Sequence, residues 1–169
     1  MASRKKIQQL AMSIIGEKLR LPIPIKEIIK SQGVKLKSLD MNDDISGILV
    51  IEQNNSTIGF KKGEPEVRQR FTMAHELGHF ILHREGELFV DKGFKTMYRP
   101  ATNIPSTEWQ EWEANEFAAC ILMPENLLRE EMQNTEMDYG DNSWIRDLAG
   151  KFKVSEAAMS IRISRLGLM

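Results

Sequence analysis

Two histidines four residues apart, with a glutamate beside the first, are the residues of this chain whose types and spacing best suit chemistry. They lie in the segment His75-Glu76-Leu77-Gly78-His79, which fits the H-E-x-x-H pattern. On an α-helix, side chains four residues apart share a face at a separation of about 5–6 Å, so the two imidazoles can bind one zinc ion. Glu76 then flanks the ion, where it can accept a proton from water and pass it to a leaving amine. The pattern predicts a zinc peptidase site with Glu76 as general base.

A catalytic zinc site needs a third protein ligand and one open position for water. The third histidine of the chain, His83, is a poor candidate, because a straight helix places it roughly 12 Å from His75 along the axis. The single cysteine, Cys120, falls in an apolar run that is typical of a protein core. A carboxylate is therefore the natural choice.

The segment after residue 107 supplies the candidate carboxylates, which are Glu108, Glu111, Glu113 and Glu116. Small residues at 114 and 118 indicate the face of this predicted helix that can pack against the histidine helix. Glu111 lies three and seven residues before them and extends that face, whereas Glu113 points about 200° away from Glu111. We favour Glu111 as the third ligand, and Glu113 stays open as the alternative.

The histidines fall in a segment that is predicted to form one long helix over residues 66–83. Pro65 stands at its expected first position, where a missing N–H costs nothing. Apolar residues cover most of its circumference, which is typical of a helix buried in the middle of a domain. Polar side chains on a buried helix need an explanation, and those of the H-E-x-x-H segment indicate a metal-binding role.

The remaining chain predicts an α+β fold, with a small antiparallel sheet packed on the central histidine helix and a helical segment after it. Helices are expected first, then about three strands, then the histidine helix, a loop without clear period, and further helices. Helices are expected at residues 4–20, 25–31, 66–83, 107–122 and 124–132, and strands at residues 34–37, 47–52 and 56–60. The loop is expected at residues 84–105. We expect a peptidase domain over residues 1–132, with a helical extension over residues 133–169 packed on it.

That extension resembles a helix-turn-helix, with Ser155 capping its second helix. Between residues 143 and 169 five basic residues stand against two acidic ones, a net charge of +3 that permits phosphate contacts. The basic residues are Arg146, Lys151, Lys153, Arg162 and Arg165.

Composition bounds these interpretations. The 169 residues suit one compact domain with a small appended part, and the net charge of −1 favours neither nucleic acid nor membrane. One cysteine fits a reducing compartment, so we expect a cytoplasmic protein. The sequence contains no run of about 18 apolar residues, so no membrane span is predicted.

Two blocks of sequence together resemble the ImmA/IrrE metallopeptidases. The first is RFTMAHELGH at residues 70–79, followed by Leu82-His83. The second is EWEANEFAA at residues 111–119, followed by LMP at residues 122–124. Their order and separation match the family as well, and the resemblance runs from about residue 20 to the end.

The resemblance implies a gluzincin-like fold with zinc held by His75, His79 and Glu111 and with Glu76 as the catalytic base. Known members are site-specific proteases that inactivate helix-turn-helix repressors during mobile-element induction or stress responses. The resemblance thus implies a repressor protein as partner and substrate, and a role in transcription regulation. In size the chain is similar to the short, mobile-element type.

Several points stay open at this stage. Tyr98, Arg99 and Tyr139 lie in predicted loops, and any of them is a candidate donor to the developing oxyanion. A strand at the sheet edge offers backbone pairing to an extended peptide. The rival interpretation is a regulator that binds DNA or a repressor without cutting it, with zinc serving structure. The presence of Glu76 favours the peptidase, because a structural zinc site is closed by four protein ligands and needs no base.

Overall fold

The computed structural model describes residues 2–51, 55–83, 88–91, 108–135, 141 and 143–168. Within these residues the predicted α+β class is confirmed, and none of the helices combines the length and apolarity that crossing a membrane requires. The elements are α1 (Arg4–Ile15), the 3-10 turn η1 (Gly16–Lys18), α2 (Ile25–Ser31), β1 (Lys35–Leu39), β2 (Gly47–Val50), β3 (Thr57–Lys61), α3 (Glu66–Leu82), β4 (Leu88–Asp91), α4 (Glu108–Leu122), α5 (Glu125–Gln133), α6 (Ser143–Phe152) and α7 (Glu156–Arg165).

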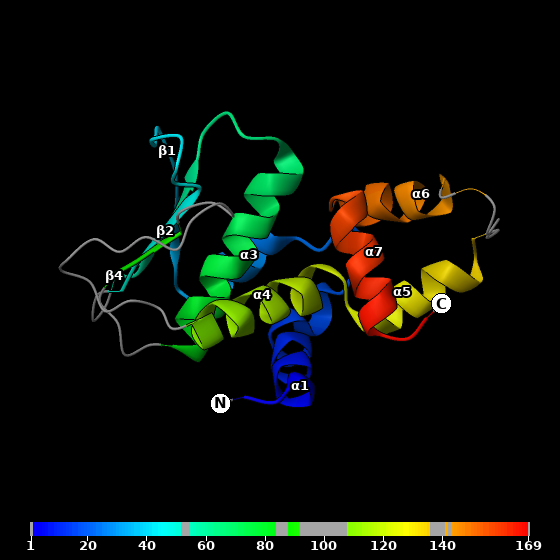
Figure 1. Cartoon of the computed structure of the whole chain (residues 1–169). Coiled ribbons are helices and arrows are strands. Elements are labelled where there is room, and N and C mark those ends of the chain that lie inside the picture. The colour runs from blue at the N-terminus through cyan, green and yellow to red at the C-terminus, as the bar shows by residue number, and fades with distance from the viewer. Residues whose placement is uncertain are drawn as a thin grey trace.

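The central element is α3, which carries both histidines. Pro65 stands one residue before the helix as its N-cap, and Glu66 follows at the positive end of the helix dipole. The strands β2 and β3 pack on one side of α3 and the helix α4 packs on another, as Figure 1 shows. Every residue from Thr72 to Phe80 is consequently buried. The predicted central, buried helix therefore has the expected position and length.

The sheet has the strand order β1-β3-β2-β4 and is mixed. β2 runs antiparallel to both β3 and β4, whereas β1 runs parallel to β3. The expected antiparallel pairing is therefore confirmed for β2 with β3 and β4. It is wrong for β1, because alternation of apolar and polar residues predicts a strand but not its partner. The strand β4 falls within residues 84–105, where no regular element was predicted, since a short apolar run carries no period.

Close helix packing joins the two long helices. A Cβ atom added at Gly78 of α3 would lie 3.1 Å from both the Cα and the carbonyl oxygen of Ala114 in α4, and 3.2 Å from Phe117 Cδ1. The backbones thus approach each other so closely at Gly78 that a side chain there would force α4 to shift by a few tenths of an ångström. Phe117 and Ala118 of α4 are fully buried beside this contact and extend the hydrophobic core.

The C-terminal helices form a helix-turn-helix-like pair. Ser155 caps α7 by accepting a hydrogen bond from the Ala158 N–H at 3.2 Å, as the sequence predicts. The turn before it places Lys153 at φ 51°, the left-handed conformation that ends α6. Trp144 and Phe152 of α6 are buried, so the pair packs into the same core as the rest of the chain.

We expect Gly78→Ala to destabilise the protein by about 1–3 kcal/mol, because the added methyl group meets helix backbone that cannot rotate away. Urea unfolding followed by circular dichroism measures this free energy. Gly150→Ala in α6 is the matched control, since a Cβ there meets nothing within 4 Å. The control should gain up to about 1 kcal/mol from helix propensity. A stabilised Gly78→Ala protein would show that the two helices are not in close contact.

Candidate metal centre

The two histidines of α3 face each other across one helical turn. Their side chains are buried, with 4% of His75 and 2% of His79 exposed. The ring centroids lie 4.7 Å apart, and the two Nε2 atoms are separated by 3.0 Å. The spacing of four residues therefore brings the two ring nitrogens to a single point on the helix surface.

Glu111, in the first turn of α4, reaches the same point. Its Oε2 lies 3.2 Å from His75 Nε2, and its Oε1 lies 3.3 Å from His79 Nε2. Among the described residues this is the group of histidine, cysteine and acidic side chains placed to hold a metal ion. The Glu111 side chain keeps 40% of its surface exposed, so the cluster is open to solvent on that side.

The separations of the three donors suit a zinc ion. In a tetrahedral site with bonds of about 2.0–2.1 Å, two ligand atoms lie about 3.3–3.4 Å apart. The separations of 3.0, 3.2 and 3.3 Å in this cluster come close to that edge length. Two imidazoles with one carboxylate are also a donor set typical of a catalytic zinc site, and three protein ligands leave one position for water.

The electrostatics of the cluster point the same way. Burial disfavours the charged form of Glu111, but hydrogen bonds from His75 and His79 outweigh burial and hold the pKa of this carboxyl well below its usual range. Burial lowers the pKa of His79, against an opposing hydrogen bond to Glu111. The ionised carboxylate supplies a negative charge, and each imidazole would supply a nitrogen lone pair once its Nε2 proton is released, which is how such ligands bind a divalent cation.

Asn115 is a functional candidate that the sequence analysis did not identify. Its Oδ1 lies 3.1 Å from His75 Nδ1, where an amide oxygen can accept a proton only from Nδ1–H. With Nδ1 protonated, the neutral imidazole would present the lone pair of Nε2 to a metal ion. Asn115 lies four residues after Glu111 on the same face of α4. This spacing is the signal that could have revealed it, because a ligand histidine usually has such an outer partner.

Glu113, the alternative third ligand, lies elsewhere. It is buried with 4% of its surface exposed, and its Oε2 lies 3.3 Å from His83 Nε2. Its Oε1 accepts a hydrogen bond from the backbone N–H of Ala2. Burial lowers the pKa of His83, with the nearby Glu113 carboxylate opposing the shift. His83 is the C-cap of α3, which agrees with its expected place at the helix end.

Glu76, the expected general base, is fully buried between α3 and the sheet. A Cβ atom added at Gly47 of β2 would lie 2.8 Å from Glu76 Oε1 and 2.5 Å from Thr72 Cγ2. The absence of a side chain at Gly47 therefore leaves the space that the carboxylate occupies. The oxyanion candidates Tyr98, Arg99 and Tyr139 lie outside the described residues.

The chain matches a peptidase family model described as the IrrE N-terminal-like domain over residues 29–164. No curated protein matches the chain. The matched span includes α3 and α4, which carry the candidate metal ligands, as well as α6 and nearly all of α7.

Loss of the carboxylate that joins the two histidines should weaken metal binding severely. We expect Glu111→Gln to lower zinc affinity by more than the roughly 10- to 100-fold that loss of an outer partner costs. Competition with a chromogenic chelator measures this affinity. Glu113→Gln, two residues away on the same helix, is the matched control and should change it less than about tenfold. The reverse order of the two effects would make Glu113 the ligand.

Proposed function

Because the chain belongs to the IrrE N-terminal-like peptidase family, we propose that it is a zinc-dependent endopeptidase that cleaves a helix-turn-helix repressor protein. The observation that carries the proposal is the convergence of His75, His79 and Glu111 within 4.8 Å of one another on adjoining helices. A buried carboxylate, Glu76, lies on the same helix next to His75. This arrangement combines a three-ligand metal site with a base, which a purely structural site does not need.

Each residue of the cluster has a distinct role in the proposed reaction. A zinc ion, when bound, supplies a Lewis acid that acidifies water and polarises a peptide carbonyl. His75, His79 and Glu111 would hold the ion, and Asn115 would accept the Nδ1–H of His75 so that Nε2 faces the ion. A carboxylate oxygen of Glu76 accepts the proton of the attacking water and then delivers it to the nitrogen of the departing amine.

The substrate class is supported by the paired sequence blocks that resemble the ImmA/IrrE peptidases. A repressor substrate would place the reaction in the cytoplasm, in agreement with a chain that has one cysteine. The proposed role in mobile-element induction has the same support. The exposed side of Glu111 indicates the direction from which a peptide would enter.

The rival interpretation, a DNA-binding regulator, relied on five basic residues of the C-terminal helices. In the structure each of them pairs with a carboxylate within the chain. Arg146 pairs with Glu156, Lys151 with Glu131, Lys153 with Glu66, and both Arg162 and Arg165 with Glu116.

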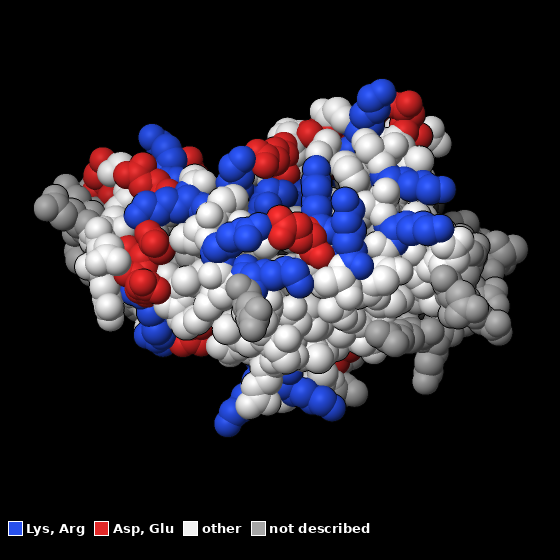
Figure 2. All heavy atoms as spheres, turned by 180° about the vertical axis from the view of Figure 1, so that it is seen from behind, with Lys and Arg blue, Asp and Glu red and all other residues white. Residues whose placement is uncertain are grey.

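Figure 2 shows lysine and arginine side chains gathered on the face seen from behind, with aspartate and glutamate side chains among them. A nucleic-acid-binding protein presents lysine and arginine clustered on one face or along a helix, but the five basic residues of α6 and α7 each have a carboxylate partner. These pairings favour the peptidase over the DNA-binding regulator.

We expect Glu76→Gln to keep zinc content at the wild-type level and to lower the rate of repressor cleavage about 10²–10⁴-fold, the usual contribution of a general base. The assay combines zinc-loaded protein with helix-turn-helix proteins encoded near its gene, and gel electrophoresis detects the products. Glu27→Gln, in the exposed part of α2, is the control and should cleave at the wild-type rate. Undiminished cleavage by Glu76→Gln would remove Glu76 from the reaction.

A second variant tests the position of that base without changing its chemistry. In Gly47→Ala the new methyl group would overlap Thr72 and Glu76 Oε1, so the carboxylate must move. We expect cleavage to slow by at least about tenfold while zinc affinity stays unchanged, because a base must stay within hydrogen-bond reach of the proton it removes. Gly150→Ala, whose methyl group meets no neighbour, should cleave normally. A Gly47→Ala protein with full activity would contradict this placement of Glu76.

A further inference from the structure

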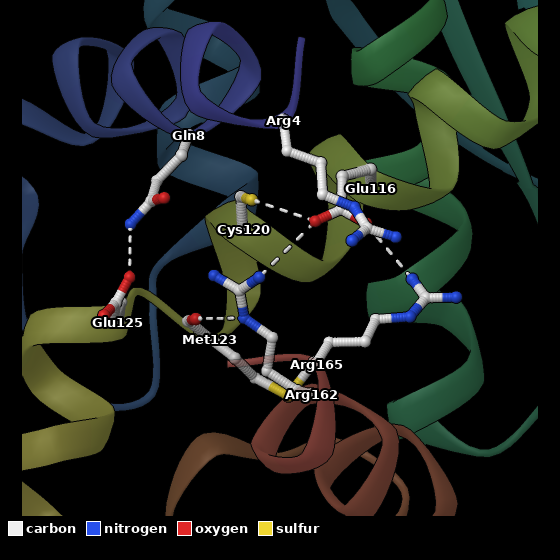
Figure 3. Close-up of polar contacts among 8 residues, drawn as sticks. All are labelled: Arg4, Gln8, Glu116, Cys120, Met123, Glu125, Arg162 and Arg165. Carbon is white, nitrogen blue, oxygen red and sulfur yellow. Dashed lines mark hydrogen bonds and ion pairs between the residues drawn. The ribbon is translucent and has the colours of Figure 1, made fainter. Parts of the chain in front are cut away.

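A second buried carboxylate of α4, Glu116, is surrounded by arginines from both ends of the chain. Only 3% of Glu116 is exposed. Its Oε2 accepts a hydrogen bond from Arg165 Nη1 at 3.1 Å, and its Oε1 lies 3.6 Å from Arg162 Nη1. Arg4 Nε lies 3.9 Å from Oε2. Figure 3 shows these side chains, from α1 and α7, directed at one carboxylate on α4.

Arg162 holds α4 at two points. Like Glu116 it is buried, with 3% of its surface exposed. Its Nη1 faces the Glu116 carboxylate, and its Nε donates to the Met123 carbonyl, directly after the last residue of α4, at 3.2 Å. A planar guanidinium with two fixed contacts sets the orientation of its partner as well as its distance.

The C-terminal pair of helices, α6 and α7, also contacts α3. The carbonyl of Lys153, in the turn between α6 and α7, accepts a hydrogen bond from Arg70 Nε of α3 at 3.2 Å. The Lys153 ammonium donates to both carboxylate oxygens of Glu66, the first residue of α3, at 3.0 and 2.9 Å. Arg70 is buried, with 7% of its surface exposed. The C-terminal pair is therefore attached to both helices that carry the metal-binding side chains.

The helices α3 and α4 and the α6–α7 pair are thus each in contact with the other two. The helices α3 and α4 touch closely at Gly78 and Ala114. In Figure 1, α7 lies across the open side of the angle between them, toward the start of α3 and the end of α4. The two helices also pack against each other beyond this point, and the α6–α7 pair adds attachments at the start of α3 and the end of α4, which restrict the angle between them further. The angle matters because Glu111 lies on α4 and the two histidines lie on α3.

A buried ion pair is an expensive way to gain stability. Taking both charges out of water carries a large desolvation penalty, and apolar residues of similar size often give equal or greater stability. Arg162 contacts α4 through the Glu116 carboxylate and contacts the Met123 carbonyl just after the end of that helix. The orientation of α4 matters for a metal centre, because metal–ligand distances must lie within about 0.2 Å of their standard values.

We propose that Arg162 and Glu116 are positioning residues of the metal centre, and that the α6–α7 pair is a brace that sets the angle between α3 and α4. The proposal depends on the metal site of the proposed function. It assigns the helix-turn-helix-like pair a role inside the peptidase in place of DNA reading. Removal of the ion pair should weaken metal binding even where the fold stays stable.

The test measures zinc affinity by chelator competition and apo-protein stability by urea unfolding, in the full chain. We expect Arg162→Met to lower zinc affinity about tenfold, in the range of an outer partner. The double variant Glu116→Gln with Arg162→Met leaves no buried charge unpaired, so its urea midpoint should return toward wild type. Its zinc affinity should stay about tenfold lower. If zinc affinity in the double variant lies within twofold of wild type, the pair serves stability alone and the proposal is wrong.

Two further variants make the outcome unambiguous. Arg146→Ala breaks the exposed Arg146–Glu156 pair within α6–α7, which touches neither ligand helix, and should leave zinc affinity unchanged. If the double variant does not fold, Arg162→Lys retains the charge without the two-point contact and carries the same expectation. A wild-type chain without zinc affinity would contradict the metal site itself, whereas failure of the brace would appear as unchanged affinity in these variants.

Discussion

The close approach of α3 and α4 at Gly78 is the constraint on which the rest of the site depends. Without a side chain at Gly78, the backbone of Ala114 comes within reach of α3. The first turn of α4 then brings Glu111 to the two imidazoles, and the next turn brings Asn115 behind His75. On the sheet side of α3, the lack of a side chain at Gly47 leaves space for the Glu76 carboxylate. Two glycines thus make room for the carboxylate groups that the proposed chemistry uses.

The helix α4 distributes its acidic residues by helical phase. Glu111 and Asn115 share the face that meets the histidines, Glu113 meets His83, and Glu116 meets the arginines of α7. Three carboxylates within six positions therefore have three different surroundings. The strongly lowered pKa of Glu111 follows from its two histidine partners and distinguishes it from an ordinary surface glutamate. The same helix connects the metal centre to the C-terminal pair.

Much of this arrangement could be predicted from the sequence, since it depends on local periodicity. The buried helix around Gly78 follows from its apolar pattern, and the place of Glu111 followed from the small residues at 114 and 118. The parallel pairing of β1 with β3 could not be predicted, because a strand pattern does not name its partner. The ion pair of Glu116 with Arg162 was also missed, because 46 positions separate its members and only the tertiary fold joins them. Charge counting over α6 and α7 could not reveal that each cation has a carboxylate partner within the chain, because those partners lie on other elements or turns.

The most direct test of the account is anomalous diffraction at the zinc edge from crystals of the zinc-loaded protein. The account predicts one strong peak about 2.0–2.2 Å from His75 Nε2, His79 Nε2 and a carboxylate oxygen of Glu111, with no fourth protein ligand. A peak bound by Glu113, His83 or Cys120, or the absence of a peak between α3 and α4, would contradict it.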